Sequence, residues 1–248
     1  MVFLIFLTLP LILPIPAFIL DILVMLNLIF ALFILLIAEY VKSPMDFFPL
    51  PTLFIISANF GLLVNIFAAI LILKKGTDFD GRLIRFASSW LAGSGGKVPL
   101  GIGLMFFIAG LAMHIMLIGK AAIRSTEIST WFTREAMPEN QLIINAKLST
   151  GSIDEKEFTI RKEALQKEAD FYTVMDDIAK FIFVREKYRI CIIALTILGG
   201  ILIGIRPEGS LFANAVEIYV PLVIGNGLLS IIPVNLVSFA TDSVITRS

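Results

Sequence analysis

Few side chains in this sequence have the types and spacing that metal or catalytic chemistry requires. The 248 residues include one histidine, His114, and one cysteine, Cys191. These two are too few for a Cys/His metal site, and a single cysteine provides no disulfide framework. Residues 93–97 (GSGGK) resemble a phosphate-binding loop, but Leu91 stands where that motif needs its first glycine and Val98 follows the lysine. We expect a flexible entry to a helix there, and we predict no enzyme, no cofactor and no metal.

Polar residues inside long uncharged runs carry more information. Five asparagines lie within or beside such runs and three acids lie at their edges: Asn27, Asn59, Asn65, Asn226, Asn235, Asp21, Glu39 and Asp242. A polar group in hydrocarbon marks either a hydrogen bond between helices or a hydrated path. For each asparagine, and for His114, a bond to a neighbouring helix is the better interpretation. Several together also suggest a polar seam or a subunit interface, and a proton relay at His114 is the alternative.

The composition places the chain in a membrane. Hydrophobic residues make up 58% and charged residues 16% of the chain, whereas soluble domains average about 25% charged. The 20 basic and 20 acidic residues cancel, so no net field attracts nucleic acid. Of these 40 charges, 24 fall in residues 120–189. The sequence therefore predicts a membrane protein with one polar insert.

Six uncharged runs predict the membrane helices. They cover residues 2–20, 22–38, 47–73, 98–119, 190–205 and 218–241. A helix needs about 20 apolar residues to cross the hydrocarbon, so Tyr188 and Arg189 are expected to extend the short fifth run by snorkelling. Near Asp21 the first pair is either two short helices joined by a turn or one long broken helix. Pro221 and Pro233 are expected to break the last run. The fold class is an all-α integral membrane protein with about six transmembrane helices.

The basic residues predict the orientation and the division of the chain. Nine near-membrane basic residues lie on the side of the insert against six opposite, so the positive-inside rule places the insert in the cytoplasm. Residues 1–119 would hold spans one to four, with an interfacial helix at about 79–91. Residues 120–189 would form the cytoplasmic insert between spans four and five, and residues 190–248 would hold spans five and six.

The insert is predicted to be small and mostly helical. Ser152 and Glu155 form a capping-box pattern that starts a helix reaching Asp170. A second helix is expected over residues 172–184, and turns at 137–138 and 149–151. Two acids in the second helix, Asp176 and Asp177, lack a third ligand nearby, so we expect a solvated helix face rather than a metal site. In the next span, Gly200 and Gly204 permit close helix approach and are candidate contacts between copies.

Several motifs occur in one order along nearly the whole chain. In the insert these are residues 132–138 (FTREAMP), 151–155 (GSIDE) and 168–172 (EADFY). In the membrane runs they are residues 13–16 (LPIP), 48–53 (FPLPTL), 225–228 (GNGL) and 245–247 (ITR). Together they resemble the FHIPEP family, which supplies the large export-gate protein of flagellar and virulence type III secretion systems. The EADFY run is closer to the flagellar branch.

The resemblance implies gate or coupling roles for nine positions: Asp21, Asn65, Asn140, Asn145, Lys147, Asp154, Asp170, Asp176 and Asn226. In the family, charged residues at several of these positions are associated with use of the proton motive force. This chain departs from that pattern, because Asn140 replaces a lysine and Asn145, Lys147 and Asn226 replace aspartates. Gly61 replaces an arginine of the third span. Asparagine has no titratable proton, so proton coupling at these positions is not expected.

The resemblance also implies an assembly. It predicts a homo-oligomeric ring around a narrower export pore in the bacterial inner membrane, beside other export-gate membrane subunits. Full-length relatives add two spans and a soluble domain that docks the export ATPase complex and cargo–chaperone complexes. This sequence stops at Ser248, so we expect a diverged and truncated copy of the N-terminal transmembrane portion. Two alternatives stay open: a non-exporting remnant with a structural role, and a small-solute or ion transporter whose asparagine-lined seam is the pathway.

Overall fold

The chain folds into a bundle of long helices. A computed structural model describes residues 15–41, 49–92, 99–205 and 212–247. All regular elements in these ranges are helical, and five helices are long and apolar enough to cross a membrane. These are α2 (Ala17–Tyr40), α3 (Leu50–Lys75), α5 (Leu100–Trp131), α7 (Glu155–Gly204) and α8 (Phe212–Arg247). The all-α membrane fold class is confirmed.

Two predicted features fall at or outside the described ranges. Most of the first predicted run, residues 2–20, lies outside them, as does the phosphate-loop-like segment 93–97. Asp21 lies inside α2, one turn after its start, so no turn separates it from the run that follows. The helix continues through this acid because its carboxylate bonds to another helix, as described below.

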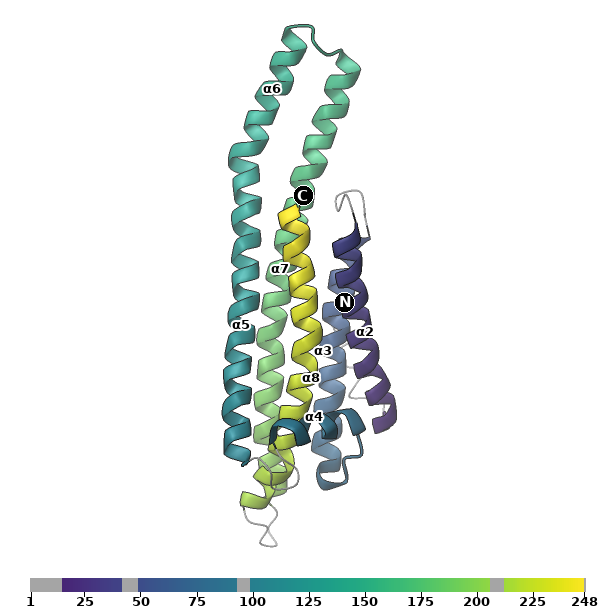
Figure 1. Ribbon diagram of the computed structural model, residues 1–248, viewed down its shortest axis with the longest axis vertical. Helices are drawn as coiled ribbons and strands as arrows, with labels where there is room; N and C mark the ends of the chain where they lie inside the picture. Colours follow the sequence, from purple (N-terminus) through teal and green to yellow (C-terminus); the bar gives the residue numbers. More distant parts are fainter. Residues whose placement is uncertain (1–14, 42–48, 93–98, 206–211, 248) are drawn as a thin grey trace.

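The molecule has two parts, a bundle and an arm (Figure 1). In the bundle, α2, α3, α5, α7 and α8 run side by side, and the short helix α4 (Arg82–Ala92) lies across one end. At the other end, α5 continues outward into α6 (Met137–Ser149). After a turn, the first half of α7 leads the chain back to the bundle. These segments form a two-helix arm that projects beyond the bundle.

The arm leaves the membrane helices without a break. Between α5 and α6, residues Phe132–Ala136 form a π-helical turn, so the predicted turn at 137–138 is wrong. Pro138 occupies the first turn of α6, where its missing N–H costs least. The wide turn just before it re-registers the backbone hydrogen bonds, and the helical path continues. The chain therefore passes straight from a membrane span into the arm.

The turn at the tip of the arm is built from glycine and an aspartate cap. Gly151 has φ +69°, and Ser152 N–H donates to the carbonyl of Lys147 at 2.9 Å, which ends α6 in a Schellman motif. The predicted turn at 149–151 is confirmed. Asp154, rather than Ser152, caps α7 by accepting from Glu157 N–H at 2.7 Å. The predicted capping box is thus placed two residues too early.

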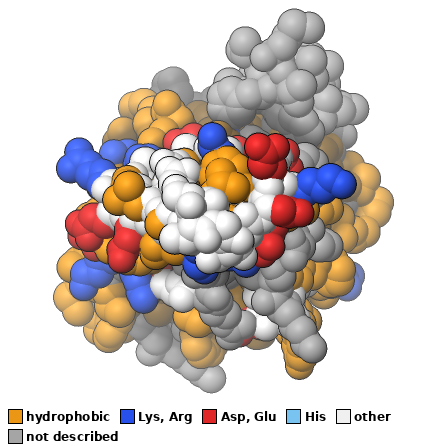
Figure 2. Space-filling view, turned by 90° about the horizontal axis from the view of Figure 1, so that it is seen from above, with side chains coloured by type: hydrophobic (Ala, Val, Ile, Leu, Met, Phe, Trp, Pro, Cys, Tyr) orange, Lys and Arg blue, Asp and Glu red, His pale blue; other side chains and the backbone are white. Residues whose placement is uncertain are grey.

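α7 is a single helix of 50 residues, about 75 Å long. The prediction of separate helices ending at Asp170 and starting at Tyr172 is wrong. Both Phe171 and Tyr172 are buried and continue the helical stripe, so nothing interrupts the backbone there. In the arm this stripe packs against α5 and α6 in a small cluster of Phe132, Leu165, Ala169 and Tyr172. Seen from the arm end, side chains of both charges lie around a centre of uncharged and apolar groups (Figure 2).

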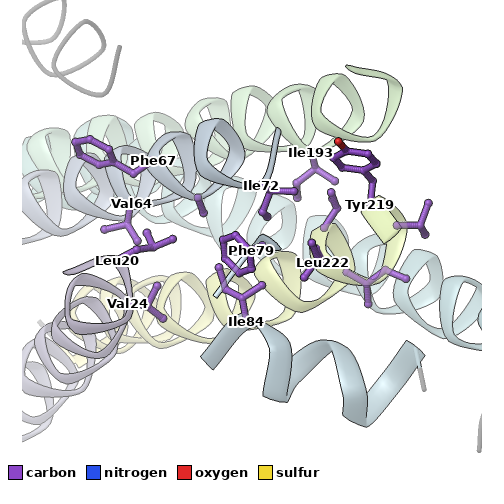
Figure 3. Packing of buried hydrophobic residues seen from close by; sticks show 14 of the residues in the cluster. Leu20, Val24, Val64, Phe67, Ile72, Phe79, Ile84, Ile193, Tyr219 and Leu222 are labelled. Atoms are coloured by element: carbon purple, nitrogen blue, oxygen red, sulfur yellow. The ribbon is translucent and has the colours of Figure 1, made fainter. Parts of the chain in front are cut away.

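Two apolar clusters fill the bundle. The α4-side cluster gathers residues from α2, α3, α4, α5, α7 and α8, and Phe79 from the segment before α4 (Figure 3). Its members include Leu20, Val24, Phe67, Phe79, Ile84, Phe107, Ile193 and Ile224. The arm-side cluster lies toward the arm and includes Ala31, Phe54, Ile118, Met175, Ile182 and Val237. Large apolar side chains also face outward on α2, α5 and α7, as expected of helices whose solvent is lipid.

α4 is held at the end of the bundle by two contacts. The Asp21 carboxylate accepts hydrogen bonds from the backbone N–H groups of Arg82 (2.9 Å) and Leu83 (3.2 Å), which satisfies the exposed donors at the start of α4. A Cβ atom on Gly225 would lie 2.4 Å from the carbonyl oxygen of Ile84. The backbone of α4 therefore sits directly on α8, with Phe86 and Trp90 exposed.

Close packing between helices also explains why the last span, α8, is unbroken. Pro221 and Pro233 lie inside a continuous α8, so the predicted break is wrong. Neighbouring helices shield such positions in a bundle. Gly200 and Gly204 face α8 of the same chain, because added Cβ atoms would lie within 2.6 Å of Tyr219 and 2.5 Å of Ala215. Within this chain these glycines therefore serve the close contact between α7 and α8; their predicted role as contacts between copies stays a prediction.

Gly225→Ala tests the seat of α4. The new methyl group would collide with the α4 backbone, so α4 must shift, and trypsin should cleave faster at the exposed Arg82 and Arg85 in detergent. Gly110→Ala is the matched control, because nothing lies within 4 Å of its Cβ position. Both substitutions gain about 1 kcal/mol of helix propensity, so only packing differs. Equal cleavage rates in the two variants would contradict this account.

Cysteine labelling tests the orientation. Lys156 lies exposed on the arm and Asp80 is exposed beside α4, at opposite ends of the molecule. With Cys191 replaced by serine, Asp80→Cys should react with a membrane-impermeant thiol reagent in intact cells, whereas Lys156→Cys should not. Permeabilised cells provide the control, where both should react. The opposite pattern in intact cells would refute the cytoplasmic placement of residues 120–189.

Candidate functional site

Polar side chains from all five membrane helices meet in one layer across the bundle, which we call the polar layer. Its members are Asn27, Ser57, Asn59, His114, Arg185, Glu186, Arg189, Ser230 and Asn235. On each helix these residues lie between a member of the α4-side cluster and a member of the arm-side cluster. On α7, for example, they lie between Ile182 and Ile193. The layer therefore divides the apolar core in two.

Helix geometry places the layer at membrane depth. Arg189 lies 15 residues before Gly204 at the end of α7, a rise of about 22 Å. His114 lies 14 residues after Leu100 at the start of α5, a rise of about 21 Å. A hydrocarbon layer about 30 Å thick that begins at these helix ends would enclose both residues. The expectation that Arg189 snorkels is wrong, since only 2% of this residue is exposed.

His114 joins α5 to α7 and α8. Its Nδ1 lies 2.6 Å from Asn235 Oδ1, and its Nε2 lies 2.9 Å from Glu186 Oε2. Arg189 Nη2 lies 2.7 Å from the same Nε2 and 2.6 Å from Glu186 Oε2. Arg189 Nη1 donates to Ser230 Oγ at 2.7 Å. The prediction that His114 bonds to a neighbouring helix is confirmed.

The Nε2 atom of His114 faces two groups of α7 that lie one helical turn apart, Glu186 Oε2 at 2.9 Å and Arg189 Nη2 at 2.7 Å. The ring therefore links α5 to both members of the Glu186–Arg189 ion pair.

The asparagines mostly bond between helices, as predicted. Asn59 on α3 accepts from Arg185 Nη1 on α7, and the Arg185 guanidinium also lies 5.2 Å from the ring centre of Phe181. Asn226 on α8 donates to Asn65 Oδ1 on α3 at 3.1 Å. Asn235 bonds to His114 as described. Asn27 makes no such bond within the described part of the chain and instead lines a cavity.

The positions singled out by family resemblance do not gather in one place. Asn65 and Asn226 form a buried pair in the bundle. Asn140, Asn145 and Lys147 lie exposed on α6 in the arm. The structure therefore separates the arm positions from the membrane pair, and the three exposed side chains face solvent rather than the bundle.

The four acids among those positions have different surroundings. Asp21 caps α4 and Asp154 caps α7, while Asp170 is exposed and accepts from Gln166 at 3.0 Å. Asp176, expected on a solvated face, is instead buried.

At the base of the arm, Asp176 joins α5 and α7. It accepts from the Thr126 hydroxyl on α5 and from Lys180, both at 2.7 Å. The hydrogen bond between Lys180 and Asp176 holds the pKa of Lys180 above its ordinary value.

Sequence reasoning missed the charged members of the polar layer. Arg185, Glu186 and Arg189 lie just before the uncharged run that begins at residue 190, so counting uncharged runs assigns them to the polar insert. A helical stripe could have revealed them, because the buried residues of α7 recur every three or four positions from the arm into the membrane. They are Tyr172, Met175, Ile178, Ala179, Ile182, Arg185, Glu186, Arg189, Ile193, Thr196 and Gly200.

These features define an α-helical integral membrane protein whose longest helices continue into a projecting arm. The profile of the FHIPEP family matches residues 7–248, and the chain belongs to this family. It is 41% identical over 99% of its length to the flagellar biosynthesis protein FlhA of Borreliella burgdorferi. It is 39% identical over 95% of its length to FlhA of Treponema pallidum. The chain spans about a third of these relatives, 35% and 33% respectively. No solved structure matches.

Glu186→Gln tests the polar layer. The change removes the carboxylate that offsets the Arg189 charge, and breaking a buried ion pair typically costs about 3–5 kcal/mol. We expect the purified variant to unfold at a lower temperature in mild detergent. Glu163→Gln is the matched control, because Glu163 is exposed on the same helix, and it should unfold like the wild type. An unchanged unfolding temperature for Glu186→Gln would show that the layer does not stabilise the bundle.

Proposed function

We propose that this chain forms the membrane portion of an export-gate component in a flagellar-type protein secretion apparatus. The observation that carries the proposal is the family match over residues 7–248, which covers the membrane helices and the arm together. The 41% identity to a flagellar biosynthesis protein supports the flagellar branch.

In this proposal the protein is multi-pass in the bacterial inner membrane with its arm in the cytoplasm. Copies form a ring around the export pore and contact other gate subunits in the membrane. The export ATPase complex and cargo–chaperone complexes would bind the part of longer relatives that this chain does not cover. The charged surface of the arm supports a location in water, and the outward apolar faces of α2, α5 and α7 support a location in lipid.

The long helix α7 would link the gate to the arm. It carries Arg185, Glu186 and Arg189 in the membrane and Asp176 at the base of the arm, with no interruption between them. Because a continuous helix is stiff along its axis, a displacement at the polar layer would reach the arm.

The small-solute transporter is the less supported alternative. Most of its proposed pathway residues are bonded to one another, as in the Asn65–Asn226 and His114–Asn235 pairs. The cavity in the polar layer has room for about one water molecule. A solute larger than water would have to rearrange the layer.

A fusion experiment tests the proposed function. The chain is joined to the C-terminal part of a full-length FHIPEP relative and expressed in cells that lack that relative. The unrestored fusion should not support export, because the neutral or basic side chains at 140, 145, 147 and 226 cannot exchange protons as carboxylates do. Restoring Asn140→Lys, Asn145→Asp, Lys147→Asp and Asn226→Asp should recover measurable export of flagellar subunits into the medium.

Matched substitutions separate specific restoration from added charge. Ser149→Asp and Gln166→Lys place new charges at other exposed arm positions and should recover nothing. If the restored fusion, present in the membrane at normal levels, still fails to export, the gate function is refuted. If the unrestored fusion exports normally, the gate function stands, and the coupling group is sought among the remaining titratable side chains. Of these, Asp176 is the buried acid at the base of the arm, while Asp21 and Asp154 are occupied as helix caps.

A further inference from the structure

The face of α4 that points away from the bundle carries aromatic and basic side chains together. Phe86 and Trp90 are 71% and 79% exposed, while Ile84 on the opposite face is fully buried against the bundle. Arg82 and Arg85 are exposed on the same face as the two aromatic rings. Packing within the described part of the chain therefore leaves these four side chains uncovered, and exposed apolar rings rimmed by charge are typical of a binding surface.

The position of α4 along α8 gives its depth. The α4 backbone sits on Gly225 of α8, and 17 residues further toward the arm Asp242 pairs with Arg124 of α5 at 3.3 Å. That separation is a rise of about 26 Å, close to the hydrocarbon thickness of about 30 Å. A bilayer whose arm-side surface meets the Arg124–Asp242 pair therefore has its other surface near α4 (Figure 1).

The two sides of the exposed face differ in chemistry. With 3.6 residues per helical turn, Phe86 and Trp90 lie on one side of Arg82, and Arg85 lies on the other. Arg85 Nη2 donates to the Thr77 carbonyl at 3.0 Å, in the turn that follows the end of α3. The Arg85 side therefore faces away from the middle of the bundle, and the aromatic side faces toward it. Rings toward the hydrocarbon and arginines toward the surface are the arrangement of a helix that lies in the membrane interface.

The start of α4 adjoins an outward apolar surface of α2. The Asp21 carboxylate binds the first N–H groups of α4, and Phe18 and Ile22, which flank Asp21 on α2, are 63% and 58% exposed. Apolar surfaces of this kind on membrane helices face lipid. Lipid that covers α2 at this level therefore also reaches the outer face of α4.

The charge around α4 is positive. Residues 74–85 include four basic and two acidic side chains, and Asp21 adds a third acid, which leaves a net charge of +1. Two of the acids are engaged, because Asp21 accepts from the backbone of α4 and Asp80 pairs with Lys75. The Arg82 guanidinium makes no hydrogen bond or ion pair with the described residues. A guanidinium binds phosphate through two parallel hydrogen bonds, so Arg82 is suited to a phosphate from outside the protein.

We propose that the outer face of α4 binds an anionic phospholipid of the surrounding bilayer. The lipid phosphate would bind Arg82, with Arg85 one turn further along adding positive charge, and an acyl chain would lie along Phe86 and Trp90. The excess positive charge favours a headgroup of net negative charge, such as phosphatidylglycerol, over a zwitterionic one. The site does not depend on the proposed export role, since it requires only the folded bundle in a membrane.

Fluorescence quenching by brominated lipids tests the proposal. The chain has two tryptophans, so Trp131→Phe leaves Trp90 as the reporter. The purified full chain with this change is placed in phosphatidylcholine vesicles that contain an equal fraction of brominated phosphatidylglycerol or brominated phosphatidylcholine. Bromine quenches tryptophan fluorescence on contact. The brominated phosphatidylglycerol should quench Trp90 more strongly, to an extent that corresponds to about fivefold enrichment beside the ring, the factor that one basic residue contributes near an anionic membrane surface.

Three arginine variants in the same background locate the lipid. Arg82→Gln should lower the enrichment to about one, while brominated phosphatidylcholine should still quench Trp90 and thereby show that α4 remains in lipid. Arg82→Lys keeps the charge and should keep most of the enrichment. Arg134→Gln is the matched control, because Arg134 is exposed in the arm, and it should behave like the parent chain.

Three results would overturn the proposal. Equal quenching by the two lipids in the parent chain would show an interfacial helix that does not select an anionic lipid. The absence of quenching by either lipid would show that protein, such as a second copy of the chain, covers Trp90. An unchanged enrichment in Arg82→Gln would place the anionic lipid elsewhere on the surface.

Discussion

The structure depends on how charged side chains are satisfied in a medium that offers no water. Arg189 is almost fully buried about 22 Å from the end of its helix, so the protein itself must supply its partners. Glu186, His114 and Ser230 do so from three helices. Each of these partners is placed by the others, because a carboxylate or a guanidinium alone at this depth would be strongly destabilising. The helices of the bundle are consequently held in one arrangement at this level, with an apolar cluster on either side.

The same layer sets the relation between membrane and arm. Two of the five spans do not end at the membrane surface: α5 passes through a π turn into α6, and α7 continues for its full 50 residues. Asp176, with Thr126 and Lys180, joins α7 to α5 where these two helices leave the bundle. The arm is thus mechanically part of the spans. This continuity gives a physical route by which a change among buried charges could alter the surface of the arm.

The departures from the FHIPEP pattern have different structural consequences. Asn140, Asn145 and Lys147 are exposed on α6, so they change surface chemistry without disturbing the packing. Gly61 has a larger effect. Where the resemblance implies an arginine on α3, this chain has no side chain, and the space beside it is lined by Arg185 and Arg189 from α7. In this chain, therefore, the positive charge at this place in the bundle comes from α7 and not from α3.

The sequence by itself determined the all-α membrane class, most of the spans and the bonding of the asparagines between helices, because hydrophobic run length and polar exceptions are local properties. It could not determine where α7 enters the membrane. Arg185, Glu186 and Arg189 are charged, and counting charges assigns them to water; only packing against His114, Ser230 and Asn59 makes them interior. Likewise, proline and glycine predicted breaks that the neighbouring helices prevent in α8. Local composition indicates whether an isolated side chain would prefer water or lipid. The tertiary structure decides which protein groups take the place of that solvent around it.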